Sequence, residues 1–147
     1  GDTLVLNTMS ERTPTSALAN RQEEIDAIFC VNTLLEVIEK LEQTETELAQ
    51  EIAKSLQRNS PLAMAAALAI ISKQQAENSS FEDALKMEYR FTYRAMEHGD
   101  FLEGIRAAII DKDRAPKWRQ TLKTVSQADL TLMTSPLGHA DLSLTED

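Results

Sequence analysis

The chain has 147 residues, of which 42% are hydrophobic and 27% are charged, and its formal net charge is -9. These values exclude a disordered chain, and the acidic balance argues against nucleic acid or an anionic membrane as a partner. No apolar run reaches the roughly 20 residues that a membrane helix needs, and the scarcity of Gly, Pro and β-branched residues predicts an all-α fold.

Hydrophobic periodicity divides the chain into short helices, and we expect a compact bundle of about six of them. The helical stretches are expected at residues 17–29, 34–41, 48–59, 61–77, 81–98, 101–109 and 126–133. Thr33 with Glu36 forms a capping box at one helix start, and Pro61 after Ser60 marks another, since Pro at the first helical position loses no intrahelical hydrogen bond. The helix from Pro61 is Ala-rich and apolar nearly all round, so it is the candidate for the central helix.

Further cap signals lie in the second half of the chain. Ser80 with Asp83 resembles a capping box, in which each side chain satisfies a backbone donor at the helix start. Gly99 is suited to the left-handed conformation that often ends a helix. Asp100 with Glu103 has the spacing of a cap for the next helix. These signals predict one helix that ends near residue 98 and another that begins at once.

The ends of the chain differ from its middle. Residues 1–16 have no helical pattern and are expected to be a linker or a cloning remnant, and residues 17–133 are expected to form one helical domain. The acidic tail over 134–147 is expected to be mobile. Cys30 is the single cysteine, so an intrachain disulfide is excluded and a reducing compartment is expected. That compartment is the cytoplasm, or the mitochondrial matrix in a eukaryote.

Three ordered motifs in the second half point to a known family. They lie at residues 81–90, 98–107 and 109–118. They resemble the C-terminal region of 3-hydroxyisobutyryl-CoA hydrolases in the enoyl-CoA hydratase (crotonase) superfamily. The family pattern there is Met-Glu-Tyr-Arg, then Asp-Phe-x-Glu-Gly-x-Arg-Ala, then Ile-Asp-Lys-Asp-x-x-Pro-Lys-Trp. Residues 25–39 and the Ser60-Pro61 helix start are also similar to family members, so the resemblance extends over roughly residues 25–118.

This resemblance implies an all-α, C-terminal helical region of an enzyme that acts on acyl-CoA thioesters. Family members build the thioester site in an N-terminal spiral of ββα units, where two backbone N–H groups stabilise the charge that develops on the thioester oxygen. The Gly-rich segment for that role is missing from this sequence, so no catalytic residue is predicted in it. We expect this chain by itself to be inactive and to support the N-terminal crotonase core of the same protein.

Basic residues cluster in one part of this acidic chain. Two acidic residues, Asp111 and Asp113, lie within the same stretch. The cluster consists of Arg106, Lys112, Arg114, Lys117, Arg119 and Lys123. The resemblance implies that Lys112 contacts the phosphates or the adenosine end of coenzyme A, because a lysine after the Glu-Gly motif does so in related enzymes. The alternative is that these are solvated charges on a terminal loop.

Other side chains have a structural interpretation that we favour. The charges of Glu88 and Arg90 are each expected to be paired with an opposite charge at helical spacing, and Tyr89 to pack with a bonded hydroxyl. The functional alternative is that these charges brace the active-site loops of the core. Trp118 is expected to anchor the loop after the helix, and Gly104 to permit close helix contact.

No metal site is predicted, because neither histidine has other ligands at metal-binding spacing. His98 is expected to interact with a helix dipole, and His139 lies in the tail. Cys30 is expected to be an inert buried thiol, since no histidine accompanies it in a catalytic pattern. No cofactor is predicted either; acyl-CoA would be the substrate of the whole enzyme.

Three functions follow from these observations. The first is the C-terminal segment of a 3-hydroxyisobutyryl-CoA hydrolase of valine breakdown, which would pack on the core, cover the acyl-CoA cleft and take part in assembly. The second is the same region of an enoyl-CoA hydratase or isomerase. The third is a non-catalytic helical assembly module, in which the apolar 61–77 helix would meet a protein partner or another copy of the chain.

Overall fold

The computed structural model describes residues 16–144, which fall into two compact units that meet in sequence at Cys30 and Val31. The first unit contains the 3-10 turn Ala19–Arg21 and α2 (Gln22–Phe29), in which Ile28 is buried. The elements of the second are α3 (Leu34–Glu42), α4 (Glu47–Leu56), α5 (Pro61–Glu77), α6 (Phe81–Arg94), α7 (Phe101–Ile105), a π-helical turn (Arg106–Ile110), α8 (Gln127–Thr134) and a 3-10 turn (Gly138–Ala140). No strand occurs over 16–144, so the all-α prediction is confirmed. The predicted extents of the linker, domain and mobile tail stay predictions.

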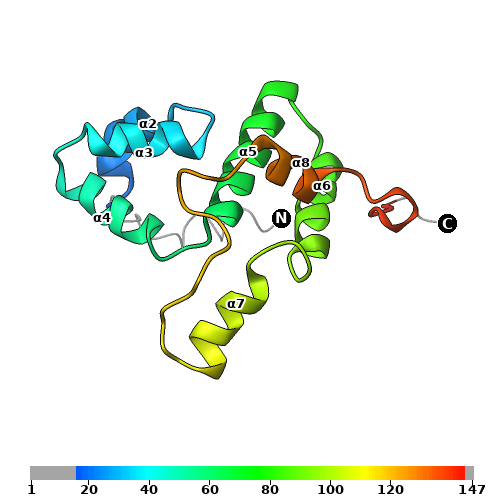
Figure 1. Cartoon of the computed structure of the whole chain (residues 1–147). Helices are drawn as coiled ribbons and strands as arrows, with labels where there is room; N and C mark the ends of the chain where they lie inside the picture. Colours follow the sequence, from blue (N-terminus) through cyan, green and yellow to red (C-terminus); the bar gives the residue numbers. More distant parts are fainter. Residues whose placement is uncertain (1–15, 145–147) are drawn as a thin grey trace, which may run out of the picture. The chain divides into compact units, whose positions relative to one another are not determined.

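Helix α5 is the central element of the second unit, as its sequence predicts. It contacts α3, α6 and α8, and Figure 1 shows α5 and α6 side by side with α8 between them and the viewer. Ala65 and Ala66 are buried on α5, and their small side chains let neighbouring helices approach closely. Leu34 and Ile38 of α3 pack with Ala65 in one buried cluster. The alanines therefore explain why one helix can be covered from several sides.

Three of the predicted helix starts carry the N-terminal caps that the sequence indicates, at Thr33, Ser60 and Ser80. The Thr33 hydroxyl accepts from the Glu36 N–H, and the Glu36 carboxylate accepts in return from the Thr33 N–H at 2.9 Å. Ser80 and Asp83 make the same reciprocal pair at the start of α6. The Ser60 hydroxyl caps α5 by accepting from the Ala63 N–H at 3.2 Å. Local spacing alone thus fixes where these helices begin.

The end of α6 differs from the prediction. The helix ends at Arg94 rather than near residue 98, and irregular turns connect it to α7. Gly99 has no positive φ, so the predicted left-handed cap is wrong; Asn78 adopts that conformation at the end of α5. Gly99 is needed for another reason, because a Cβ there would lie 2.8 Å from the backbone oxygen of Ala95. A steric contact, not a backbone angle, requires this glycine.

The close approach of Gly99 to the Ala95 oxygen predicts that alanine substitutions at Gly99 and Gly104 have different effects on stability. Gly99→Ala is expected to lower the free energy of unfolding by about 1–3 kcal/mol, because its Cβ overlaps a backbone atom that cannot swing away. Gly104→Ala is the control: its Cβ would lie 3.8 Å from the Trp118 ring, an ordinary contact, and Ala favours helix by up to about 1 kcal/mol. Urea unfolding followed by circular dichroism measures both. Equal destabilisation by the two changes would contradict the steric explanation.

Two arginines of α6 hold the segment that follows α8. Arg94 donates to the carbonyls of Ser135 (2.6 Å) and Pro136 (3.2 Å), which satisfies acceptors beyond the end of α8. Arg90 makes a bidentate pair with Asp141, with Nε at 2.9 Å from Oδ1 and 3.0 Å from Oδ2. The expected pairing of Arg90 at helical spacing is therefore wrong, since its partner lies far along the chain.

Candidate functional site

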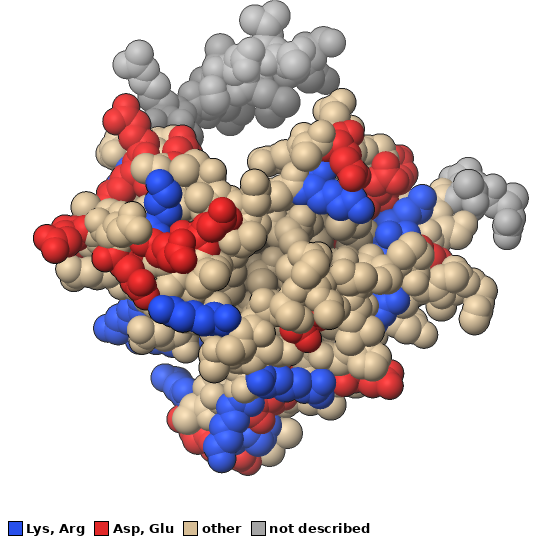
Figure 2. Space-filling view, turned by 45° about the horizontal axis from the view of Figure 1, so that its top comes forward, with Lys and Arg blue, Asp and Glu red and all other residues tan. Residues whose placement is uncertain are grey.

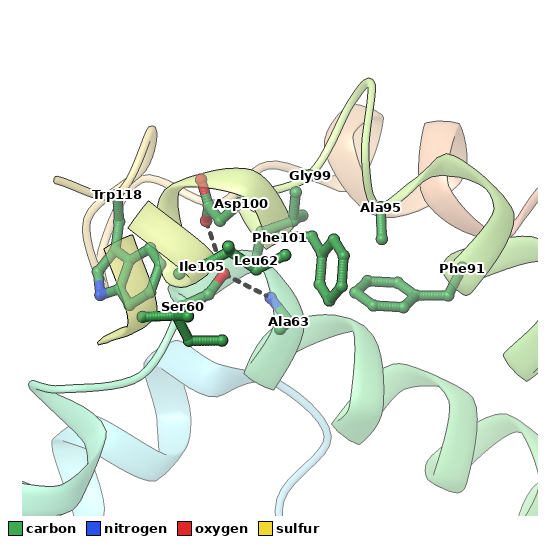
Figure 3. Close-up of a pocket in the computed structure, with 12 residues that line it drawn as sticks. Ser60, Leu62, Ala63, Phe91, Ala95, Gly99, Asp100, Phe101, Ile105 and Trp118 are labelled. Atoms are coloured by element: carbon green, nitrogen blue, oxygen red, sulfur yellow. Dashed lines mark hydrogen bonds between the residues drawn. The ribbon is translucent and has the colours of Figure 1, made fainter. Parts of the chain in front are cut away.

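An apolar cavity of about 300 Å³ lies between the start of α5, the end of α6 and α7. Figure 3 shows the rings of Phe91 and Phe101 next to each other on one side of it and the Trp118 indole on the other. Its lining residues are Ser60, Leu62, Ala63, Phe91, Ala95, Gly99, Asp100, Phe101, Gly104, Ile105, Ile109 and Trp118. Most of these side chains are apolar, so the cavity suits an apolar group rather than a charged one.

Asp100 lies at the polar end of this cavity and is the one buried charged side chain over residues 16–144, with 7% of its surface exposed. Its Oδ2 accepts from the Ser60 hydroxyl at 2.6 Å, and its Oδ1 accepts from the Arg119 N–H at 3.1 Å. The predicted cap with Glu103 is wrong, because Asp100 makes no side-chain cap bond. Asp100 instead ties together the starts of α5 and α7 and the loop at Arg119.

Glu103 belongs to a second polar cluster, around Arg106. The guanidinium donates to both oxygens of Glu103, at 2.9 and 2.8 Å, and also to Asp111 at 2.6 Å and Asp113 at 2.7 Å. The Lys117 N–H donates to Glu103 at 2.6 Å. One guanidinium thus holds the loop after the π-helical turn against α7, and the three carboxylates raise the pKa of Arg106.

The same bonds lower the pKa of Glu103 to about 2, from an ordinary value of 4.5. The Arg106 guanidinium is the main cause and the Lys117 N–H is the next. A carboxylate whose pKa is lower in the folded state stabilises the fold above its unfolded pKa, and this stabilisation is lost on acidification. We therefore expect the contribution of Glu103 to fall away as the pH drops from about 4.5 towards 2.

The measurement is thermal unfolding as a function of pH. Glu103→Gln should lower the melting temperature at neutral pH. Between about pH 4.5 and 2 the melting temperature of this variant should fall less steeply than that of the wild type, because the titrating group is gone. The matched control is Glu88→Gln, which removes a carboxylate from the exposed part of α6 and should keep the wild-type slope. An unchanged slope in Glu103→Gln would disprove the assignment.

The predicted basic cluster is only partly available for binding. Arg106 is occupied as described, the Arg119 guanidinium donates to the Glu97 carbonyl at 3.2 Å, and Lys123 pairs with Glu42 at 3.1 Å. Figure 2 shows Lys and Arg gathered at the lower edge, over α7 and the segment that follows it. Lys112, in the segment that follows the π-helical turn, is exposed with a positive φ of 55°, which is unusual for a residue other than glycine. The contact of Lys112 with coenzyme A stays a prediction.

The structure differs from the predictions made for Cys30, His98 and Gly104. Cys30 is exposed, so the prediction of a buried thiol is wrong. His98 lies beyond the end of α6, 3.9 Å from the Glu97 carboxylate, and not at the helix end where it was expected. Gly104 faces the Trp118 ring rather than another helix. Over residues 16–144, no three His, Cys, Asp or Glu side chains are arranged to hold a metal ion.

Comparison with known proteins extends these observations. A family model described as enoyl-CoA hydratase/isomerase matches residues 3–133. The chain is 37% identical over 135 residues to the mitochondrial 3-hydroxyisobutyryl-CoA hydrolase of Homo sapiens, and 40% identical over 123 residues to that of Mus musculus. These alignments cover 90% and 82% of this chain but only 34% and 31% of the relatives. The chain thus spans about a third of the length of the curated relatives it matches.

Two solved structures are similar in fold as well as in sequence. The crystal structure of an enoyl-CoA hydratase from Rhodobacter sphaeroides matches with a TM-score of 0.84 and 43% identity, over 95% of this chain and 42% of that one. A carnitinyl-CoA dehydratase from Mycobacterium thermoresistibile matches with a TM-score of 0.84 and 29% identity, over 98% and 41%. None of the helices within residues 16–144 is long and apolar enough to cross a membrane.

Proposed function

Because the chain belongs to the enoyl-CoA hydratase/isomerase family, we propose that it is the C-terminal helical segment of an acyl-CoA thioester hydrolase that acts on 3-hydroxyisobutyryl-CoA. The observation that supports the hydrolase is the 37–40% identity, over most of this chain, to mammalian proteins of that name. We place catalysis in the part of those relatives that this chain does not match. On this proposal the chain packs against the core, covers the acyl-CoA cleft and contributes to assembly.

Exposed apolar side chains support the packing role. Phe101 and Leu102 of α7 are each 53% exposed, and Ile109 and Ile110 of the π-helical turn are more exposed still. Tyr93 of α6 is also more than half exposed. Apolar surface of this extent is unfavourable in water and is typical of a face that another part of a protein covers. The core of the same protein is the partner we propose, and self-association is the alternative.

Lys112 is the residue we propose for contact with the phosphates or adenosine end of the substrate's coenzyme A. Lys112 is exposed, with a φ of 55°, and its side chain makes no hydrogen bond or ion pair with residues 16–144. Acyl-CoA is the substrate on this proposal, and no resident cofactor is needed. The site of action we propose is the mitochondrial matrix if the source is a eukaryote, which agrees with the word mitochondrial in the names of the relatives, and otherwise the cytoplasm.

The test is release of free coenzyme A from 3-hydroxyisobutyryl-CoA, followed with a thiol reagent. The chain alone should release none, whereas the full-length gene product should hydrolyse the thioester. Lys112→Ala in the full-length protein should raise KM with little change in kcat, because it removes binding energy that is distant from the reacting atoms. Hydrolysis by the isolated chain, or none by the full-length protein, would contradict the proposal.

The second candidate is an enoyl-CoA hydratase, which is supported by the 43% identity to the Rhodobacter sphaeroides structure of that name. Such an enzyme adds water across the double bond of an enoyl thioester and leaves the thioester intact. Crotonyl-CoA therefore separates the two candidates. Loss of the conjugated double bond without release of free coenzyme A would favour the hydratase over the hydrolase.

A further inference from the structure

The apolar cavity between α5, α6 and α7 has a single charged residue in its wall, Asp100, and the described residues that line it include no Lys, Arg or His. Asp100 is 7% exposed, so its carboxylate is largely shielded from water. A charge that is removed from water is costly unless an opposite charge or several hydrogen bonds compensate it. The groups that compensate the Asp100 charge therefore decide which kind of ligand the cavity favours.

The carboxylate of Asp100 has hydrogen-bond donors but no positively charged partner. The Ser60 hydroxyl donates to one oxygen at 2.6 Å and the Arg119 N–H to the other at 3.1 Å, and both donors are neutral. The Arg119 guanidinium donates to the Glu97 carbonyl instead, and no basic side chain within residues 16–144 forms an ion pair with Asp100. The start of α5 adds only about half of a positive charge. The carboxylate is thus held in place without being neutralised, and each oxygen can accept a further hydrogen bond.

Aromatic side chains border the cavity on both sides of this carboxylate. In the view of Figure 3, Asp100 lies between the Trp118 indole and the rings of Phe91 and Phe101. An aromatic ring attracts a cation to its electron-rich face, and the attraction is stronger where water is excluded. A metal ion would require more oxygen or nitrogen ligands than one carboxylate and one hydroxyl supply. The lining therefore suits an organic cation that carries apolar groups.

We propose that this cavity binds a small organic ammonium ion, with the charged nitrogen beside Asp100 and its methyl or methylene groups against Phe91, Phe101 and Trp118. The volume of about 300 Å³ is at the lower end of the range for small-molecule sites, which suits a ligand the size of choline. The net charge of -9 also attracts cations to the chain as a whole. This ligand is opposite in charge to the coenzyme A phosphates proposed for Lys112, and its binding does not depend on thioester hydrolysis.

Titration of the chain with choline, ethanolamine and the neutral isostere of choline, in which carbon replaces the nitrogen, tests the proposal. Trp118 is the only tryptophan, so its fluorescence reports on the cavity, and calorimetry gives the affinities. At least one of the two cations should bind about tenfold or more tightly than the isostere, because only a cation is attracted by Asp100. A preference for choline would identify a methylated ammonium ligand, and a preference for ethanolamine a primary amine. Equal affinity for the isostere, or no binding of either cation, would overturn the proposal.

Variants of the lining locate the binding. Asp100→Asn should weaken cation binding about tenfold or more and leave the affinity for the isostere unchanged, and Phe91→Leu, which keeps an apolar side chain, should weaken it about threefold. Glu88→Gln removes a carboxylate from an exposed position of α6 outside the cavity, so this matched control should keep nearly the wild-type affinity. Circular dichroism verifies the folding of each variant; if Asp100→Asn fails to fold, Phe91→Leu decides. Equal losses in the cavity variants and the control would disprove the site.

The same calorimetric titration of the full-length gene product distinguishes a ligand site from a surface that the core fills. Choline or ethanolamine should bind to the full-length protein as well as to the chain alone. Binding by the chain alone would mean that the core occupies the cavity, and this result would overturn the proposal. Release of coenzyme A is measured separately, so failure of this site leaves the proposed hydrolysis untouched.

Discussion

Replacement of Met133 by alanine is expected to lower the free energy of unfolding by about 2–5 kcal/mol, because it removes a fully enclosed side chain and leaves a cavity. Met133 lies on α8 and has 0% of its surface exposed. Its helix contacts both α5 and α6, so the side chain lies where three helices meet.

The measurement is urea unfolding, and the preceding residue supplies the control. Leu132→Ala removes a similar apolar volume from the same helix, but Leu132 is 46% exposed. That change should cost about half as much or less, because nearly half of the Leu132 surface is already in water before the mutation. Similar losses at both positions would show that α8 does not pack between α5 and α6 as described.

Asp100→Ala is expected to have the second large effect, a loss of about 2–4 kcal/mol, because it leaves two partly buried donors without an acceptor. These donors are the Ser60 hydroxyl and the Arg119 N–H. They lie on segments that are far apart in sequence, so the loss should also loosen the start of α5 and the cavity beside it. Hydrogen exchange at the Ala63 N–H, which Ser60 caps, should accelerate.

Two further variants distinguish the hydrogen-bond network from a general effect of charge. Asp100→Asn keeps one acceptor oxygen for Arg119, and the Ser60 hydroxyl can turn to accept from the new amide, so most of the stability should return. Asp83→Ala removes an exposed carboxylate from a local capping box and should cost less than Asp100→Ala. If Asp100→Asn were as unstable as the alanine variant, the charge itself would be the stabilising feature.

The helices and their starts could be predicted from the sequence because the forces that set them are local. The capping pair of Thr33 and Glu36 lies three residues apart, and Pro61 fixes its own backbone angle. The apolar, Ala-rich character of α5 identified the central helix, and the ordered motifs over 81–118 indicated the family that the comparisons show. In each case the information lies within one helix or one short motif.

The roles of the polar side chains were decided by the tertiary structure. Spacing assigned Asp100 and Glu103 to one cap, but Asp100 binds Ser60, which is 40 residues away, and Glu103 binds Arg106 and the Lys117 N–H. The sequence alone could not reveal these partners, because a carboxylate accepts equally well from a neighbour or from a distant donor. The tertiary structure decides which donor lies next to each carboxylate. A polar group that is shielded from water and left without a hydrogen-bond partner is costly, so the donor that the fold brings there becomes the partner.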